Sequence, residues 1–275
     1  MRESHPSLDR DVPADAVLWR YMDFPKFVSM LKESALWFSR ADLLGDPLEG
    51  SFTLAREIER QRILENPPEG RTREELADVF RHHARLTSDN RLNVYLNCWH
   101  RGSHESMALW QGYGGGPYAI AVRTTFGLLD SLLPEKFSGS SVVAGGAPAE
   151  GDDVPPHAMP VFLTQVRYID HSSTTERLKD ENNMYTPFAF KSVSYAHENE
   201  VRAVYWNISN FDAITGQRIN PAGLFFPVNL RALITDIVVS PLAPTWFAPL
   251  VRSTFDKYGF LFAITPSLTS RDAVY

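Results

Sequence analysis

The chain has 275 residues, of which 44% are hydrophobic and 22% are charged, a composition typical of a folded globular protein. Its formal net charge of −6 gives no overall basic footprint, which argues against a nucleic-acid substrate unless a local groove is basic. The single cysteine, Cys98, excludes an internal disulfide and an all-cysteine metal cluster, and it indicates a reducing compartment.

The N-terminal residues 1–15 are polar and contain no apolar core of a signal peptide. The longest apolar stretches of the chain are shorter than the roughly 18 residues that suggest a membrane span. We therefore expect a flexible leader over residues 1–15, a single domain over residues 16–275, no membrane partner and a cytoplasmic location.

The first predicted elements are a strand at 16–21, a helix at 23–34 and a strand at 35–40. Asp23 is a good N-cap for the helix, and Pro25 suits its first turn. The turn-rich stretch "LLGDPLEGS" then predicts a loop.

A charged, periodic segment follows over about residues 52–90. It predicts a helical insertion of two helices that are broken at the sequence "NPPEG". Its many arginines and glutamates are typical of a solvated helical face, and a lid or a partner surface is the alternative.

The middle of the chain predicts a strand at 92–100, a helix at 103–113, a strand at 118–125 and a helix at 126–137. Residues 138–158, "SGSSVVAGGAPAEGDDVPPHA", are rich in Gly, Ala, Pro and Asp and predict a loop.

The remaining pattern predicts further strands and helices without strict alternation. Strands are expected at 161–170, 194–206, 224–240 and 260–267, and helices at 174–193 and 245–259. This order favours an α+β fold with a mixed, mostly antiparallel sheet and flanking helices.

One charged stretch, "SYAHENEVRAVYW", raises a functional question. If it is a strand, then Glu198, Glu200 and Arg202 share one face, because successive side chains point to opposite faces. The apolar residues between them are typical of a sheet with one face in water. Close carboxylates raise each other's pKa, however, and a rigid pair of them is also a plausible chemical device.

Other stretches leave two interpretations open. Arg20 lies inside an apolar strand, where it either reaches solvent at a sheet edge or grips a phosphate or carboxylate. Trp110 and Tyr113 recur at helical spacing, so they belong to the core or present a stacking surface to a flat ring. Cys98, His100 and His104 are too few for a convincing zinc site, so we predict no metal.

Several motifs resemble those of a bacterial protein family called domain of unknown function 2971. They are "LWRY", "LKESALWFSRADLLGDPLEG", "LNCWHRGSHESMALWQGYGGGPYAIAVRTT", "FKSVSYAHENEVRAVY" and "IVVSPLAPTWFAPLVRSTFDKYGF". More distantly, an early strand with an arginine and a late strand with Glu-x-Glu resemble the layout of ADP-ribosyltransferases. That resemblance implies a split sheet and NAD as a substrate.

The resemblance also implies site residues. Glu200 is expected to be the catalytic carboxylate, with Glu198 as its helper, and Arg20 is expected to anchor NAD. Tyr113 or Trp110 is expected to stack on the nicotinamide, although the motif they lie in is a predicted helix where ADP-ribosyltransferases have a strand. The full set expected to bind NAD is Arg20, Tyr21, Trp110, Tyr113 and Arg202.

Three functions follow from these patterns. The first is NAD-consuming ADP-ribosyl transfer or NAD glycohydrolysis, as a toxin or phage-defence effector, with an acceptor and an inhibitory partner that the sequence does not identify. The second is a non-catalytic binding or sensor module, in which Arg20, Glu200 and Arg202 form a structural ion-pair network. The third is a metal-dependent hydrolase or nuclease that uses Asp46, Glu49 and Glu200.

Overall fold

The computed structural model describes residues 5–137, 158–178, 180–181, 183–207 and 220–270. Its strands are β1 (Val17–Asp23), β2 (Ala35–Arg40), β3 (Val94–Arg101), β4 (Ala119–Thr125), β5 (Lys136–Phe137), β6 (Met159–Gln165), β7 (Arg167–Ile169), β8 (Phe190–Ser192), β9 (Glu200–Trp206), β10 (Gly223–Pro227), β11 (Asp236–Val239) and β12 (Ile264–Thr265). Its α-helices are α1 (Phe24–Glu33), α2 (Leu54–Glu65), α3 (Arg73–Asn90), α4 (Met107–Tyr113), α5 (Phe126–Leu132), α6 (Leu230–Leu233) and α7 (Phe247–Tyr258). Short 3-10 helices are η1 (Ala41–Leu43), η3 (Thr186–Ala189), η4 (Val193–Glu198) and η5 (Leu268–Ser270).

The strands of the described ranges form one large sheet and one small one. The large sheet has ten strands in the order β12-β11-β4-β1-β3-β9-β6-β5, and β2 joins it beside β3 and carries β10. Its pairs are antiparallel except for β11 with β12. The parallel pair β7-β8 is the small sheet. The prediction of an α+β fold with a mostly antiparallel sheet is therefore confirmed.

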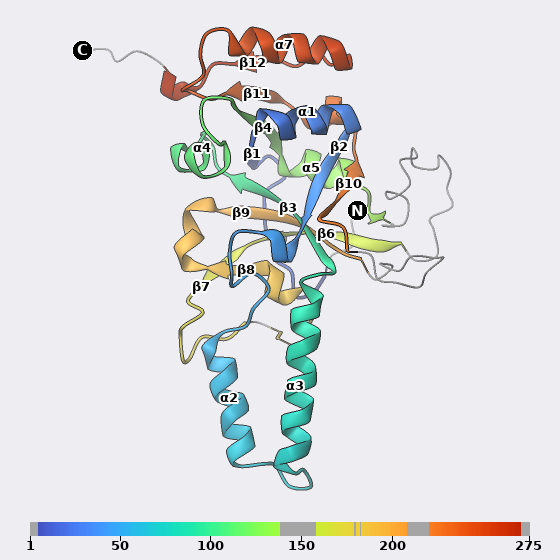
Figure 1. Ribbon diagram of the computed structural model, residues 1–275, viewed down its shortest axis with the longest axis vertical. Coiled ribbons are helices and arrows are strands. Elements are labelled where there is room, and N and C mark those ends of the chain that lie inside the picture. Colours follow the sequence, from blue (N-terminus) through green and yellow to red (C-terminus); the bar gives the residue numbers. More distant parts are fainter. Residues whose placement is uncertain (1–4, 138–157, 179, 182, 208–219, 271–275) are drawn as a thin grey trace, which may run out of the picture.

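The large sheet divides between β1 and β2. β1 pairs with β4 along its whole length, but with β3 only at Leu18↔Arg101 and Trp19↔His100. Farther along, β3 pairs with β2 instead. The two strands β1 and β2 therefore flank β3 without pairing with each other, and we call the opening between them the split (Figure 1).

The main hydrophobic core lies between the large sheet and the helices α1, α5 and α7. Phe27 and Leu31 of α1 pack there with Leu129 of α5 and Phe255 of α7, and all four side chains are buried. The rings of Phe27 and Phe255 meet edge to face, with centroids 5.9 Å apart. These contacts fix α1, and thereby the end of β1, against the sheet.

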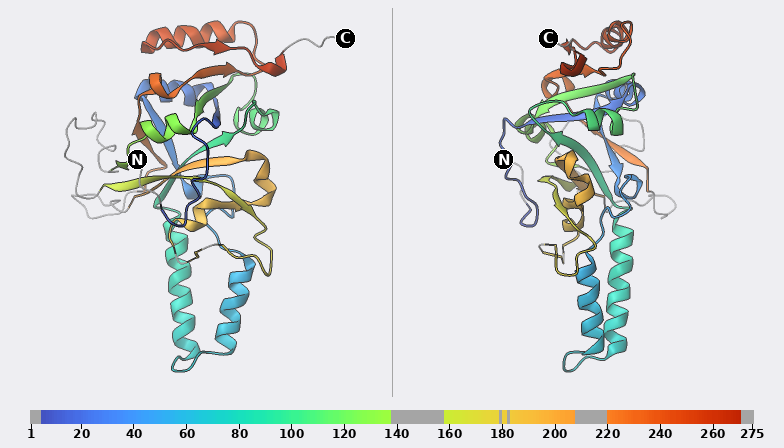
Figure 2. Two further views of the ribbon diagram at one scale, coloured as in Figure 1. Left: turned by 180° about the vertical axis from the view of Figure 1, so that it is seen from behind. Right: turned by 90° about the vertical axis from the view of Figure 1, so that its left-hand side faces the viewer.

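The two helices predicted over about residues 52–90 are confirmed as α2 and α3, which form a hairpin that projects from one end of the sheet (Figures 1 and 2). A capping box begins α3, because the Thr72 hydroxyl accepts from the Glu75 amide and the Glu75 carboxylate accepts from the Thr72 amide.

The helix α1 also begins as predicted, with Asp23 accepting from the Lys26 amide at 2.8 Å.

Other predicted elements are wrong. Residues 174–193 form no α-helix within the described ranges, because side chains there bind the local backbone: Glu181 accepts from the Leu178 amide and Asn183 from the Tyr185 amide. The strand expected at 224–240 is divided into β10, α6 and β11, with Asn229 capping α6. The strand expected at 260–267 shrinks to β12.

The structure bears on the predicted leader at residues 1–15 but hardly on the predicted loop at 138–158. Leu8 and Val12 of the expected flexible leader are buried, and the Gln165 amide donates to the Asp9 carbonyl at 2.8 Å, so this part of the leader packs along β6. The expected loop at 138–158 lies outside the described residues, apart from its last position.

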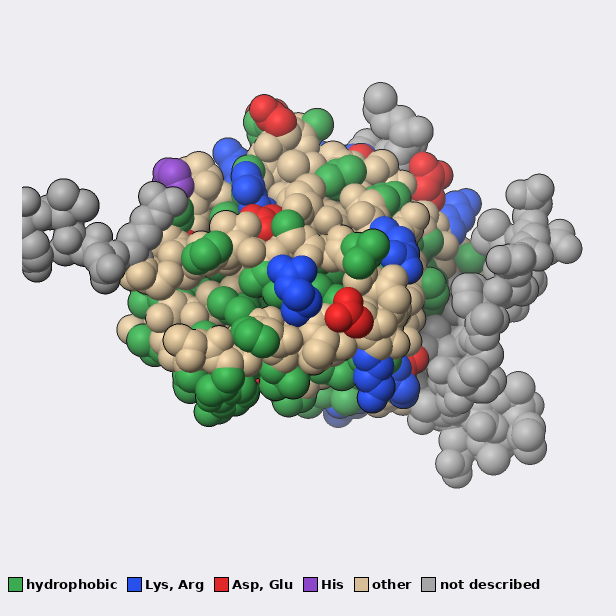
Figure 3. Space-filling model, turned by 90° about the horizontal axis from the view of Figure 1, so that it is seen from above, with side chains coloured by type: hydrophobic (Ala, Val, Ile, Leu, Met, Phe, Trp, Pro, Cys, Tyr) green, Lys and Arg blue, Asp and Glu red, His purple; other side chains and the backbone are tan. Residues whose placement is uncertain are grey.

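Several large hydrophobic side chains are exposed near α7. Figure 3 shows the end of the molecule that carries α7, where hydrophobic side chains lie among charged ones, and Trp246, Leu250 and Leu261 are exposed in this part of the chain. None of the helices in the described ranges combines the length and the apolar character that crossing a membrane requires.

Candidate functional site

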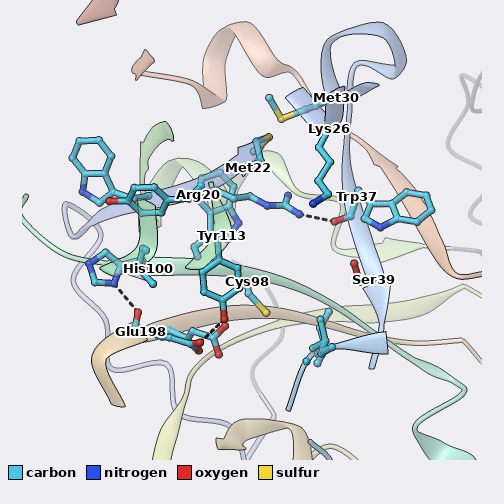
Figure 4. A pocket seen from close by; sticks show the side chains of 18 of the residues that line it. Arg20, Met22, Lys26, Met30, Trp37, Ser39, Cys98, His100, Tyr113 and Glu198 are labelled. Carbon is cyan, nitrogen blue, oxygen red and sulfur yellow. Dashed lines mark hydrogen bonds between the residues drawn. The ribbon is translucent and has the colours of Figure 1, made fainter. Parts of the chain in front are cut away.

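A cavity of about 720 Å³ occupies the split, and side chains from β1, β2, β3, α1 and α4 line it (Figure 4). Small-molecule sites typically measure roughly 300–1,000 Å³, so this cavity has the size of a ligand site. Arg20, Tyr21, Tyr113, Glu198 and Glu200 all line it. The early strand and the stretch near residue 200 therefore converge on one cavity.

The side of the cavity that β1 and α1 form is cationic. One N–H of Arg20 donates to the Trp37 carbonyl at 2.9 Å, and Arg20 forms no ion pair with any described residue. Burial lowers the pKa of Arg20 to about 10, and the nearby Cys98 offsets this only in part. Lys26 lines the same side, with its Nζ 2.9 Å from Asp23. Arg20 is half-buried, and a cation that has no carboxylate partner among the described residues is suited to hold an anionic ligand.

The charged stretch differs from its prediction as one continuous strand. Glu198 ends η4, Asn199 has a left-handed φ of 40°, and β9 begins only at Glu200. The expectation of a face in water is also wrong, because Glu200 is 6% exposed and Arg202 is fully buried. Neighbouring elements cover this face and supply partners for its charges.

Arg202 is saturated by these partners. Its Nη1 and Nη2 donate to the two oxygens of Glu49 at 2.6 and 2.9 Å, and Nη1 also donates to the Phe188 carbonyl at 3.0 Å. Nε and Nη2 donate to Glu200 Oε2 at 2.9 and 2.7 Å. All five N–H groups are therefore used, and Arg202 does not line the cavity. It holds Glu200 in place, contrary to the expectation that it binds NAD directly.

Glu200 is held as a carboxylate. Burial by itself would raise its pKa, but the charges of Arg202 and Lys191 lower that pKa below its ordinary value. Lys191 Nζ lies 3.7 Å from Glu200 Oε2, and the backbone amide of Glu200 donates to the Tyr168 hydroxyl at 2.8 Å. The cavity therefore contains a fixed negative charge at neutral pH.

Glu198 lies beside it and is bound on both oxygens. The Tyr113 hydroxyl donates to Oε1, and Lys191 donates to Oε2. A ring nitrogen of His100, Nδ1, lies 2.6 Å from the Glu198 carbonyl oxygen and fixes the backbone there (Figure 4). Since a carbonyl only accepts, this nitrogen carries the proton of the bond.

The buried cluster has an unequal charge balance. It joins the carboxylates of Glu49, Glu198 and Glu200 with the cations Lys191 and Arg202, which gives a formal net charge of −1. An excess negative charge away from water favours a positive charge in the adjacent cavity.

The aromatic residues have divided roles. Trp110 is buried in the core, where its Nε1 donates to Glu105 at 2.8 Å and its ring meets that of Tyr21 edge to face. Trp110 does not line the cavity, contrary to the expectation that it stacks on the nicotinamide. Burial raises the pKa of Tyr21 to about 12, and its hydroxyl accepts from the Ser106 amide. Trp37 and Phe225, which the sequence did not indicate, line the cavity with ring centroids 4.8 Å apart.

Of the carboxylates proposed for a metal site, Glu49 is engaged on both oxygens, which accept from Arg202. Asp46 accepts from the Leu48 amide at 2.8 Å through Oδ1, while its Oδ2 is buried and has no hydrogen-bond partner among the described residues. In the described ranges, no group of three or more His, Cys, Asp or Glu side chains is placed to hold a metal ion. Burial also raises the pKa of the Cys98 thiol, which makes it a poor nucleophile.

Sequence reasoning did not find the pairing of Glu49 with Arg202 or the role of Lys191. Glu49 and Lys191 both lie in the quoted motifs, yet Glu49 and Arg202 are 153 positions apart, and no spacing rule connects them. Phe225 lies outside those motifs. The chain matches no model of a known protein family, and a search of curated proteins finds none that is similar to it.

Proposed function

We propose that the protein cleaves the bond between nicotinamide and ribose in NAD and passes the ADP-ribosyl group to an acceptor. The observation that carries this proposal is one cavity with Arg20, which forms no ion pair with a described residue, on one side and the buried carboxylates Glu198 and Glu200 on the other. Consumption of NAD would harm the cell that contains the enzyme, so the proposal includes a role as a toxin or phage-defence effector.

The carboxylate side fits the chemistry of this cleavage. As nicotinamide leaves, the ribose develops positive charge in an oxocarbenium-like transition state, as in glycoside hydrolysis. A carboxylate that is fixed before the reaction stabilises that charge without reorganising. Glu200 fulfils this requirement because Arg202 and Lys191 keep its pKa low and its position fixed.

The cationic side fits the rest of NAD. Arg20 and Lys26 line this side of the cavity and are the proposed diphosphate ligands, since guanidinium and ammonium groups form charge-assisted hydrogen bonds to phosphate oxygens. The rings of Trp37 and Phe225 on this side offer a surface for a flat base. Holding both ends of the substrate would place the ribose beside Glu200 in one geometry.

A second candidate function is a non-catalytic binding module. It is favoured by the saturation of Arg202 between Glu49 and Glu200, which is the pattern of a structural ion-pair network. In that case the cavity would bind a nucleotide without cleaving it.

Glu200→Gln separates the two candidates, because it keeps the shape of the side chain and removes its charge. We expect the release of nicotinamide from labelled NAD to fall at least about a hundredfold, in line with the loss of one preorganised electrostatic group. Glu33→Gln, on the exposed end of α1, is the control and should leave the rate unchanged. No nicotinamide release by the unmodified protein, with or without cell extract, together with NAD binding in the cavity, would favour the binding module.

A further inference from the structure

One ionisable side chain lies in the contact between the projecting helices α2 and α3, which run side by side (Figures 1 and 2). Arg56 and Arg60 are four positions apart on α2, and Phe80 and His83 are three positions apart on α3, so each pair shares one face of its helix. These four side chains meet between the two helices, and we call them the seam.

The seam contains a hydrogen bond that fixes the protonation state of His83. Arg60 Nη2 lies 3.2 Å from His83 Nδ1. A guanidinium group only donates, so Nδ1 is the acceptor and carries no proton. The same guanidinium lies over the ring of Phe80, with Cζ 5.6 Å from the ring centroid. The observed contact of α2 with α3 therefore requires a neutral His83.

The surroundings of His83 disfavour its charged form. The guanidinium of Arg56 lies over the ring of Phe52, 3.6 Å from its centroid, and the rings of Phe52 and His83 have centroids 6.3 Å apart. Burial lowers the pKa of His83, and the charges of Arg56, Arg60 and the neighbouring His82 lower that pKa further. A cation on His83 would thus form beside two arginines.

The carboxylates around the seam pair with those arginines. Glu57 lies 3.7 Å from Arg60, and Glu181 lies 3.7 Å from Arg56. His83 itself forms no ion pair with a carboxylate of the described residues. A protonated His83 ring would therefore face two guanidinium groups without a counter-ion of its own.

We propose that His83 makes the hairpin a pH-sensitive device, in which protonation of its ring separates α2 from α3. The added proton occupies Nδ1, so the hydrogen bond from Arg60 is lost and two like charges meet at the same 3.2 Å contact. The proposal does not depend on NAD cleavage, because the hairpin contributes no side chain to the cavity.

The base of the hairpin stays attached when the seam opens. The Leu54 amide at the start of α2 donates to the His171 carbonyl at 2.9 Å, and the Asn90 side chain at the end of α3 donates to the Met184 carbonyl at 2.9 Å. Amides and carbonyls do not titrate, so acid should release the outer turns of both helices and not their junction with the sheet.

The direction of the pH dependence follows from proton linkage. The closed hairpin holds His83 at a pKa below the ordinary value of about 6.5, so the open hairpin binds more protons and gains as the pH falls through that value. At pH 5, a histidine with the ordinary pKa is about thirtyfold more often protonated than neutral. The closing equilibrium can therefore weaken by at most about thirtyfold.

The test combines an NMR titration of His83 with amide hydrogen exchange of the full-length protein at pH 7 and pH 5, corrected for the exchange rate of an unstructured chain. We expect His83 to titrate below about pH 6.5, and protection in the outer turns of α2 and α3 to fall by about threefold to thirtyfold at pH 5. Protection in β3 should stay unchanged, which distinguishes opening of the hairpin from unfolding of the whole chain.

Two variants and a matched control assign the effect to the seam. His83→Gln has no ionisable ring and offers a carbonyl oxygen to Arg60, so the fall in protection between pH 7 and pH 5 should disappear. Arg60→Met removes the facing cation, so the pKa of His83 should rise. His82→Gln changes the adjacent, exposed histidine and should keep the pH dependence of the unmodified protein.

Three results would overturn the proposal. A titration of His83 at or above about pH 6.5 would show that the seam does not disfavour its proton. An equal loss of protection in His83→Gln and in the unmodified protein would assign the effect of acid to another group. Unchanged protection of the hairpin at pH 5 would show that protonation does not separate the helices.

Discussion

Arg202 and Glu49 form a two-point ion pair in which neither side chain is exposed, with contacts of 2.6 and 2.9 Å. The pair joins the loop after η1 to the strand that carries Glu200. Because Arg202 also donates twice to Glu200, the loop determines how firmly that carboxylate is held in the cavity.

Removal of Glu49 should therefore destabilise the whole fold. Glu49→Ala leaves Arg202 with one carboxylate partner in place of two, and breaking a buried pair by removal of one member typically costs about 3–5 kcal/mol. Urea unfolding followed by circular dichroism measures the loss. Asp78→Ala on the exposed face of α3 is the control and should change stability by less than about 0.5 kcal/mol. Equal midpoints for the two variants would contradict this account.

The lowered pKa of Glu200 predicts how stability depends on acid. A carboxyl group with a lower pKa in the folded state contributes stability above the ordinary pKa of glutamate, about 4.3, and loses it as the pH falls through the lower folded value. The free energy of unfolding, measured from pH 7 to pH 3, should fall more steeply below about pH 4 for the unmodified protein than for Glu200→Gln. Parallel curves over this range would show that the charge of Glu200 does not support the fold.

Arg20 should matter for binding more than for stability. Burial makes its charge costly, as its lowered pKa of about 10 indicates, so Arg20→Met should leave the melting temperature nearly unchanged. Loss of charged hydrogen bonds worth about 1.5–3 kcal/mol should raise the KM for NAD roughly tenfold to a hundredfold. Arg231→Met on α6 is the matched control and should keep the KM of the unmodified protein. A KM unaffected by Arg20→Met would remove Arg20 from the site.

Cys98 provides a chemical reporter of the cavity, because it is the one cysteine of the chain and it lines this space. Burial raises its pKa, so little thiolate is present near neutral pH. We expect its reaction with a disulfide reagent at pH 8 to be at least about tenfold slower than in the urea-unfolded chain. Saturating NAD should slow the reaction further, and equal rates with and without NAD would place the ligand elsewhere.

Local signals in the sequence predicted several elements correctly. Asp23 and Pro25 defined the start of α1, and the break at "NPPEG" separated α2 from α3. Such signals act over a few residues, because caps and turns satisfy backbone groups within one turn of the chain. The same reasoning failed for residues 174–193, where the periodicity of apolar residues predicted a helix. There, the side chains of Glu181 and Asn183 accept hydrogen bonds from nearby backbone amides, which compete with helix formation.

By itself, the sequence determined the start of α1, the helices α2 and α3, the apolar strands β1 to β4, and the presence of unusual charges at Arg20, Glu198 and Glu200. Only the tertiary structure decided what those charges do. It paired Arg202 with Glu49 as a support, gave Arg20 no carboxylate partner within the described ranges, and brought the Tyr113 hydroxyl onto Glu198. The physical reason is that the role of a buried charge depends on the opposite charge nearest to it. In this fold, that opposite charge comes from a residue far away in the sequence.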